Sequence, residues 1–188
     1  DGLWAMRRCG DSCEACRRPF GSCSHVLCHQ NDGRSFSLIS ESSVDFVFSF
    51  DSFVQPDREI VEAYLRQLGS KLTIGAKGFI HHSNFGEYVN SPRERLPEFL
   101  AKPLIKARIL DWAHHRNPGM TAALVRHLCA QNGLHCLSKA LVQWRGSSLI
   151  DCCALLCGAA TVPTVPRKTI RKQNLMRDAA EVPPRTQR

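Results

Sequence analysis

The pattern of apolar and polar residues is clearest in the middle of the chain, where a strand-like run precedes a helix-like one. Residues 44–50, VDFVFSF, form a short apolar run that is typical of a buried β-strand. From Ile60 to Leu72, apolar residues recur at the spacing of one face of an α-helix. A second short apolar run, 77–80, completes the pattern, which predicts one βαβ unit.

Polar residues follow both predicted strands. Asp51 comes directly after the first strand, and His81 and His82 come after the second. Ligands of open α/β sheets bind beyond the carboxyl ends of the strands, so these three side chains are expected to share one rim. A carboxylate or an imidazole there can accept a proton from a substrate, which makes Asp51, His81 and His82 the candidate catalytic residues. The alternative for each is a structural role as a strand-end or turn residue.

The second half of the chain predicts one more helix and a hairpin. Thr121 is a suitable N-cap for a helix that ends at Gly133. Two apolar runs, 136–144 and 149–156, flank a short Gly-Ser turn and predict antiparallel strands. The expected fold class is therefore α/β, with a parallel βαβ unit followed by an antiparallel hairpin.

A long segment, residues 83–120, separates the βαβ unit from this second half. Its four prolines divide it into short pieces, and it follows the carboxyl end of a predicted strand. Such segments often form a lid over a site, so His115 and Arg116 are candidate substrate-binding residues. The alternative is a solvated loop.

Composition narrows the class of protein. The 188 residues are 43% hydrophobic and 22% charged, which is ordinary for a globular domain with a sizeable core. No apolar run is long enough to cross a membrane, and the N-terminus has no signal-peptide pattern, so a cytoplasmic location without a membrane partner is expected. Much of the net charge of +8 falls in the Pro-containing tail, residues 159–188, which we expect to be disordered. The body, residues 1–158, is only mildly basic, which argues against a nucleic-acid partner and leaves oligomerisation open.

Ten cysteines are many for this length, and five lie in the first thirty residues. Without a secretory signal they are expected to be reduced thiols. An alternative is a zinc-binding interaction module at the N-terminus. Its potential ligands are Cys13, Cys16, Cys23, Cys28, His25 and His29.

Several motifs together resemble class I S-adenosylmethionine-dependent methyltransferases, and in particular a bacterial subgroup that methylates hydroxyls of sugars and other small molecules. The motifs are Asn31-Asp32-Gly33, VDFVFSFDSF (residues 44–53), LTIGAKG (72–78) and GFIHHSN (78–84). The resemblance covers residues 12–156 and implies a Rossmann-like, doubly wound and mostly parallel sheet whose last strand is antiparallel. It implies S-adenosylmethionine as cofactor, contacted by Asn31, Asp32, Gly33 and Phe50, with Asp32 accepting a hydrogen bond from the adenine amino group. It also implies a hydroxyl acceptor on a sugar or natural product, and leaves room for a divalent cation such as Mg²⁺; no residues are assigned as metal ligands.

The resemblance has one large gap. The glycine-rich cofactor loop of these enzymes, and the central strand before it, have no counterpart in the sequence, so an N-terminally truncated domain is expected. An inactive or partner-dependent remnant of a methyltransferase is therefore the alternative to an active enzyme.

Overall fold

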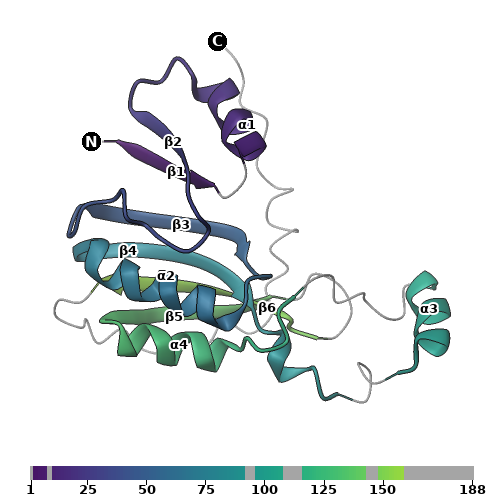
Figure 1. Ribbon diagram of the computed structural model, residues 1–188. Helices are drawn as coiled ribbons and strands as arrows, with labels where there is room; N and C mark the ends of the chain where they lie inside the picture. The colour runs from purple at the N-terminus through teal and green to yellow at the C-terminus, as the bar shows by residue number, and fades with distance from the viewer. Residues whose placement is uncertain (1, 8–9, 92–95, 108–115, 143–147, 159–188) are drawn as a thin grey trace, which may run out of the picture.

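The computed structural model describes residues 2–7, 10–91, 96–107, 116–142 and 148–158, which form two β-sheets and their helices (Figure 1). The strands are β1 (Leu3–Arg7), β2 (Val26–Gln30), β3 (Val44–Phe53), β4 (Leu72–Ser83), β5 (Leu134–Val142) and β6 (Asp151–Gly158). The helices are α1 (Gly10–Phe20), α2 (Arg58–Lys71), the short η1 (Phe85–Glu87), α3 (Glu98–Lys106) and α4 (Ala122–Gln131). None of the described helices is long and apolar enough to span a membrane.

The larger sheet has the strand order β3-β4-β6-β5. β3 and β4 are parallel and are joined through α2, which confirms the predicted βαβ unit. β6 runs antiparallel to both β4 and β5, so the predicted hairpin is confirmed and its last strand lies inside the sheet. This mixed α/β architecture confirms the expected Rossmann-like class.

The core lies on the face of the larger sheet that α2 and α4 cover (Figure 1). Apolar spacing explains the packing of α2, because Val61, Leu65 and Leu68 are all buried on one side of the helix. At the start of α4, the Thr121 side chain accepts a hydrogen bond from the Leu124 amide, as predicted for an N-cap. Gly133 ends the helix with φ of 70°, a conformation that favours glycine.

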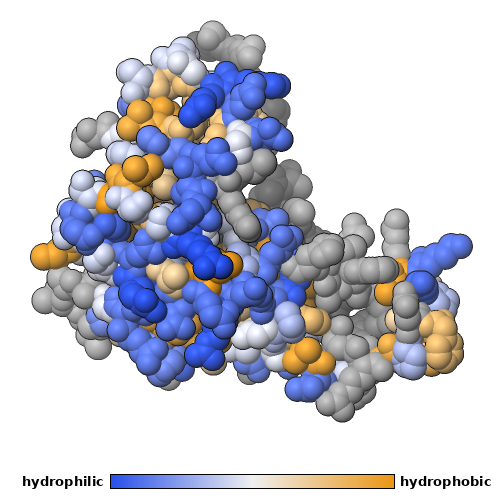
Figure 2. Space-filling model, viewed as in Figure 1, coloured by the Kyte–Doolittle hydropathy of each residue, from blue (hydrophilic) through white to orange (hydrophobic). Residues whose placement is uncertain are grey.

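The smaller sheet contains β1 and β2, which are parallel and pair with each other. Within the described residues, β1 and β3 do not pair, so each has an edge without a ladder partner. Large apolar side chains are exposed on β1, β2 and β3: Leu3, Trp4, Leu27, Phe46, Phe48 and Phe50. Figure 2 shows apolar surface around the β1–β2 sheet and the adjacent edge of the larger sheet.

The predicted insertion follows β4 and contains η1 and α3. Figure 1 shows α3 standing away from both sheets, and its Phe99 and Leu100 are exposed. Its role as a lid stays a prediction. The predicted tail, residues 159–188, lies outside the described residues.

Candidate active site at the carboxyl ends of β3 and β4

Asp51 lies in an irregular part of β3 rather than after a completed strand. The ladder with β4 is regular from Phe46 to Ser49, which pairs with Ile80, and resumes at Phe53, which pairs with His82. Four residue steps on β3 thus oppose two on β4, a bulge that bends the strand. Asp51, inside the bulge, has φ of 59° in the left-handed region, which Asp tolerates better than most residues. Its side chain is 62% exposed, so the bulge presents a carboxylate to solvent at the rim.

The bulge removes the Asp51 amide from the ladder with β4, and His81 accepts its hydrogen bond instead. The Asp51 amide donates to Nδ1 of His81 at 3.1 Å. Because an amide can only donate, Nδ1 must carry the lone pair, and the ring proton of the neutral imidazole lies on Nε2. Phe50 stacks on the ring with centroids 4.7 Å apart. His81 itself is fully buried, so its geometry suits support of Asp51 better than contact with a substrate.

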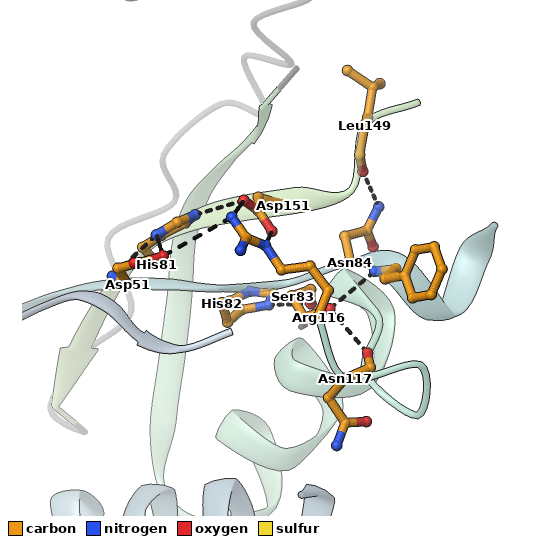
Figure 3. A network of polar contacts seen from close by, with 10 residues as sticks. Asp51, His81, His82, Ser83, Asn84, Arg116, Asn117, Leu149 and Asp151 are labelled. Carbon is orange, nitrogen blue, oxygen red and sulfur yellow. Dashed lines mark hydrogen bonds and ion pairs between the residues drawn. The ribbon is translucent and has the colours of Figure 1, made fainter. Parts of the chain in front are cut away.

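A buried carboxylate connects His81 to Arg116 (Figure 3). Asp151 Oδ2 lies 3.2 Å from His81 Nε2, although the N–H is not aimed squarely at that oxygen, which makes the contact mainly electrostatic. Arg116 donates to both oxygens of Asp151, with Nε–Oδ1 of 2.9 Å and Nη2–Oδ2 of 2.8 Å. Such bidentate pairing compensates the desolvation of Asp151, which is 0% exposed. Hydrogen bonding to Asp151 also raises the pKa of Arg116.

Arg116 reaches Asp51 as well as Asp151. Its Nη2 lies 3.9 Å from Asp51 Oδ1, at the outer limit of an ion pair. Three predicted site residues, Asp51, His81 and Arg116, are thus brought together around Asp151, a residue that the sequence did not single out. His115, the other predicted substrate-binding residue, lies outside the described residues.

His82 points to the opposite face from His81, as alternation along a strand requires. It is 1% exposed, and its Nδ1 lies 2.8 Å from the Ser83 carbonyl oxygen. Nδ1 must therefore donate, so His82 is the Nδ1–H tautomer. Burial lowers the pKa of His82 to about 4, which keeps the ring neutral at physiological pH. The catalytic role predicted for His82 stays untested.

The last two residues of the GFIHHSN motif anchor the chain. Ser83 Oγ donates to the Asn117 carbonyl, and Asn84 Oδ1 accepts from the Ala122 amide. These bonds tie the end of β4 to the segment that carries Arg116 and to the start of α4. The motif thereby ties Asn117, the residue after Arg116, to the end of β4.

The predicted cofactor residues Asn31, Asp32 and Gly33 form a separate, tight turn after β2. Asp32 Oδ1 accepts from the amides of Arg34 and Ser35, at 2.8 and 2.7 Å. These bonds lower the pKa of Asp32, so its carboxylate is ionised and held in place. Asn31 donates to the Tyr64 hydroxyl at 3.2 Å, which ties the turn to α2.

The residues at the rim do not fit a divalent cation. Asp151 already uses both oxygens for Arg116. Across the described residues, no group of three or more His, Cys, Asp and Glu side chains is placed to hold a metal, at the rim or at the N-terminus.

The nine cysteines within the described residues are free thiols. Burial raises the pKa of Cys129, on α4, and of Cys152, on β6, to about 12, so both are protonated and fill space in the interior. At the N-terminus, a hydrogen bond with Cys16 raises the pKa of Cys28. Among the described residues of this part of the chain, no three potential ligands are placed to hold a metal, so the zinc alternative gains no support from the geometry.

Comparison with known proteins identifies the fold. No protein-family model and no curated protein matches the chain. Among solved structures, the PH0226 protein from Pyrococcus horikoshii OT3 is 12% identical, with a TM-score of 0.58 over 84% of this chain and 72% of that one. A SAM-dependent methyltransferase from Methanosarcina mazei is 12% identical, with a TM-score of 0.57 over 84% of this chain and 82% of that one. Geranyl diphosphate methyltransferase, solved with GPP and sinefungin, is 10% identical, with a TM-score of 0.58 over 84% of this chain and 64% of that one.

The likeness shows that the chain has the fold of SAM-dependent methyltransferases, as the motifs predicted. At these identities it extends no further than the fold. The hydroxyl-methylating subgroup therefore stays a prediction.

Proposed function

We propose that this chain is the acceptor side of an S-adenosylmethionine-dependent methyltransferase that methylates a hydroxyl of a sugar or another small molecule. The observation that carries the proposal is the Asp51 carboxylate, which the bulge presents at the rim. His81 accepts a hydrogen bond from the Asp51 amide, and Arg116 lies beside the carboxylate. The fold supports the reaction class, and the carboxylate supports an acceptor that must lose a proton.

The residues of the chain fit the chemistry of methyl transfer to oxygen. The cofactor, when bound, supplies an electrophilic methyl group. Asp51 would accept a hydrogen bond from the acceptor hydroxyl and take its proton as the methyl group passed to oxygen; the methyl–sulfur bond would break at the same time, with S-adenosylhomocysteine as the leaving group. Arg116, whose Nη2 lies 3.9 Å from Asp51 Oδ1, limits the directions that the carboxylate can face. His81 holds the Asp51 backbone and thereby aligns the carboxylate with the acceptor.

Two features fit the cofactor. The ionised Asp32 carboxylate is fixed by backbone amides and can accept a hydrogen bond from an adenine amino group. Phe50, whose side chain is half exposed beside Asp51, offers an apolar wall. We infer no role for a metal, because the rim offers too few ligands. A cytoplasmic location and the absence of a nucleic-acid partner belong to the same proposal.

Calorimetric titration with S-adenosylmethionine tests the cofactor. We expect binding by the 188-residue chain or, if the gene encodes preceding residues, by the longer chain. Binding by neither would refute the methyltransferase proposal and favour the remnant. Binding by the longer chain alone would assign cofactor affinity to the preceding residues.

Turnover tests the role of Asp51. S-adenosylhomocysteine release is measured with a panel of sugar and small-molecule alcohols on a chain that binds cofactor. Asp51→Asn should lower kcat by about 10²–10⁴-fold, the range for a general base, while cofactor affinity is retained. Asp45→Asn, on the same strand but away from the rim, is the matched control. An Asp51→Asn variant with full activity would remove the carboxylate from the mechanism.

A further inference from the structure

We propose that Asp151 is the positioning residue of this site, and that it sets the conformation of Asp51 through the proton of His81 and the guanidinium of Arg116. The inference deepens the proposed function, on which its catalytic consequence rests. Its structural part can be tested without any methyl transfer.

Asp51 requires a support because its backbone is strained. A non-glycine residue with φ of 59° is strained and keeps this conformation only where its surroundings hold it. Solvent covers most of the Asp51 side chain. The support on the protein side is the bond from the Asp51 amide to His81 Nδ1, on the ring that Phe50 stacks against.

That support exists only in one tautomer of His81. If the proton moved to Nδ1, two N–H groups would face each other and the bond to Asp51 would become a repulsion. The Asp151 carboxylate, 3.2 Å from Nε2, favours the tautomer with the proton on Nε2. Asp151 thus acts on the Asp51 backbone without touching it (Figure 3).

Asp151 also places the second support of Asp51. Its bidentate bonds fix the guanidinium of Arg116, whose Nη2 then lies 3.9 Å from Asp51 Oδ1. One buried carboxylate therefore directs both the backbone and the side chain of Asp51. The sheet supplies this carboxylate from far along the sequence, because Asp151 begins β6 and lies opposite Ser83 at the end of β4.

Nitrogen-15 NMR of histidine side chains in the full 188-residue chain tests the inference. Long-range proton–nitrogen correlations show which ring nitrogen carries the proton. We expect Nε2–H for His81 and Nδ1–H for its neighbour His82, so that two adjacent histidines have opposite tautomers. Finding His81 as the Nδ1–H tautomer in the unmodified protein would overturn the inference, even if no variant of Asp151 folds.

Asp151→Asn should move the His81 Nδ1 resonance toward the protonated position and shift the Asp51 amide resonance. Asp45→Asn makes the same chemical change elsewhere and should leave both unchanged. Unaltered His81 and Asp51 resonances in a folded Asp151→Asn protein would refute the inference.

With an acceptor in hand, Asp151→Asn should lower kcat by about 10²-fold through misplacement of Asp51, with little change in cofactor affinity. An unchanged kcat would refute the catalytic consequence. Absence of turnover in the unmodified chain, together with the expected tautomers, would instead contradict the proposed function alone.

Discussion

The buried His82 should make the fold sensitive to acid, and His82→Asn isolates this effect. Asn is chosen because its side-chain amide can still donate to the Ser83 carbonyl. The pKa of His82 is about 4 in the folded protein, against an ordinary value of 6.5. Between these pH values the unfolded chain binds a proton at His82 that the folded chain does not bind. The free energy of unfolding therefore falls as the pH drops from about 6.5 toward 4.

The size of the effect follows from the two pKa values. Each pKa unit corresponds to about 1.36 kcal/mol, so the separation of about 2.5 gives about 3 kcal/mol of stability lost at pH 4. This is a large fraction of the 5–15 kcal/mol that is typical of a domain.

Urea unfolding followed by circular dichroism, at pH 7 and at pH 4, measures the difference. The unmodified protein should lose about 3 kcal/mol more than His82→Asn over this interval. Protonation of carboxylates with a lowered pKa, such as Asp32 and Glu41, also lowers the free energy of unfolding in acid. Both proteins contain these carboxylates, so their contribution cancels in the difference. His127→Asn, at an exposed position on α4, should behave like the unmodified protein. Equal pH dependence in the unmodified protein and His82→Asn would refute the reasoning.

Two further substitutions test the packing that positions the site. Leu65→Ala removes a fully buried side chain of α2 and should lower the free energy of unfolding by about 2–5 kcal/mol in urea denaturation, whereas a loss below about 1 kcal/mol would contradict its place in the core. Gly78→Ala would put a Cβ 2.8 Å from Val47 Cγ1, forcing β3 and β4 apart at a cost of about 1–3 kcal/mol by thermal unfolding. Val47→Ala in the same chain should recover part of that loss, and no recovery would exclude the contact as its cause.

Local patterns in the sequence predicted much of the fold. The helical spacing of α2, the Thr121 cap and the antiparallel hairpin depend on residues close in sequence, and all three are confirmed. Strand ends were less accurate. β3 continues through Phe53, because a bulge lets the ladder resume after Asp51, and a bulge has no clear signature in VDFVFSFDSF.

The candidate site depends on pairing between distant strands, which a local pattern does not contain. Asp51 and His81 were predicted as neighbours, but their hydrogen bond depends on the left-handed conformation of Asp51. Asp151 was missed because its role comes from the register of β6 against β4. One signal was present: Asp151 is a charged residue at the start of the apolar run DCCALLC, and a buried charge requires a partner.

The two-stranded sheet of β1 and β2 has a consequence for how the molecule opens. A pair of strands without further ladder partners is marginally stable, and in the described structure its ties to the larger sheet include contacts of the β2–β3 connection with Tyr64 and Gln67. β1 and β2 should therefore open locally, and their amides should exchange with solvent long before those of β4 and β6. A strand that paired with both β1 and β3 would join the two described sheets into one, so that they would unfold as a single cooperative unit. The turn that carries Asp32 would then be held as firmly as the bulge that carries Asp51.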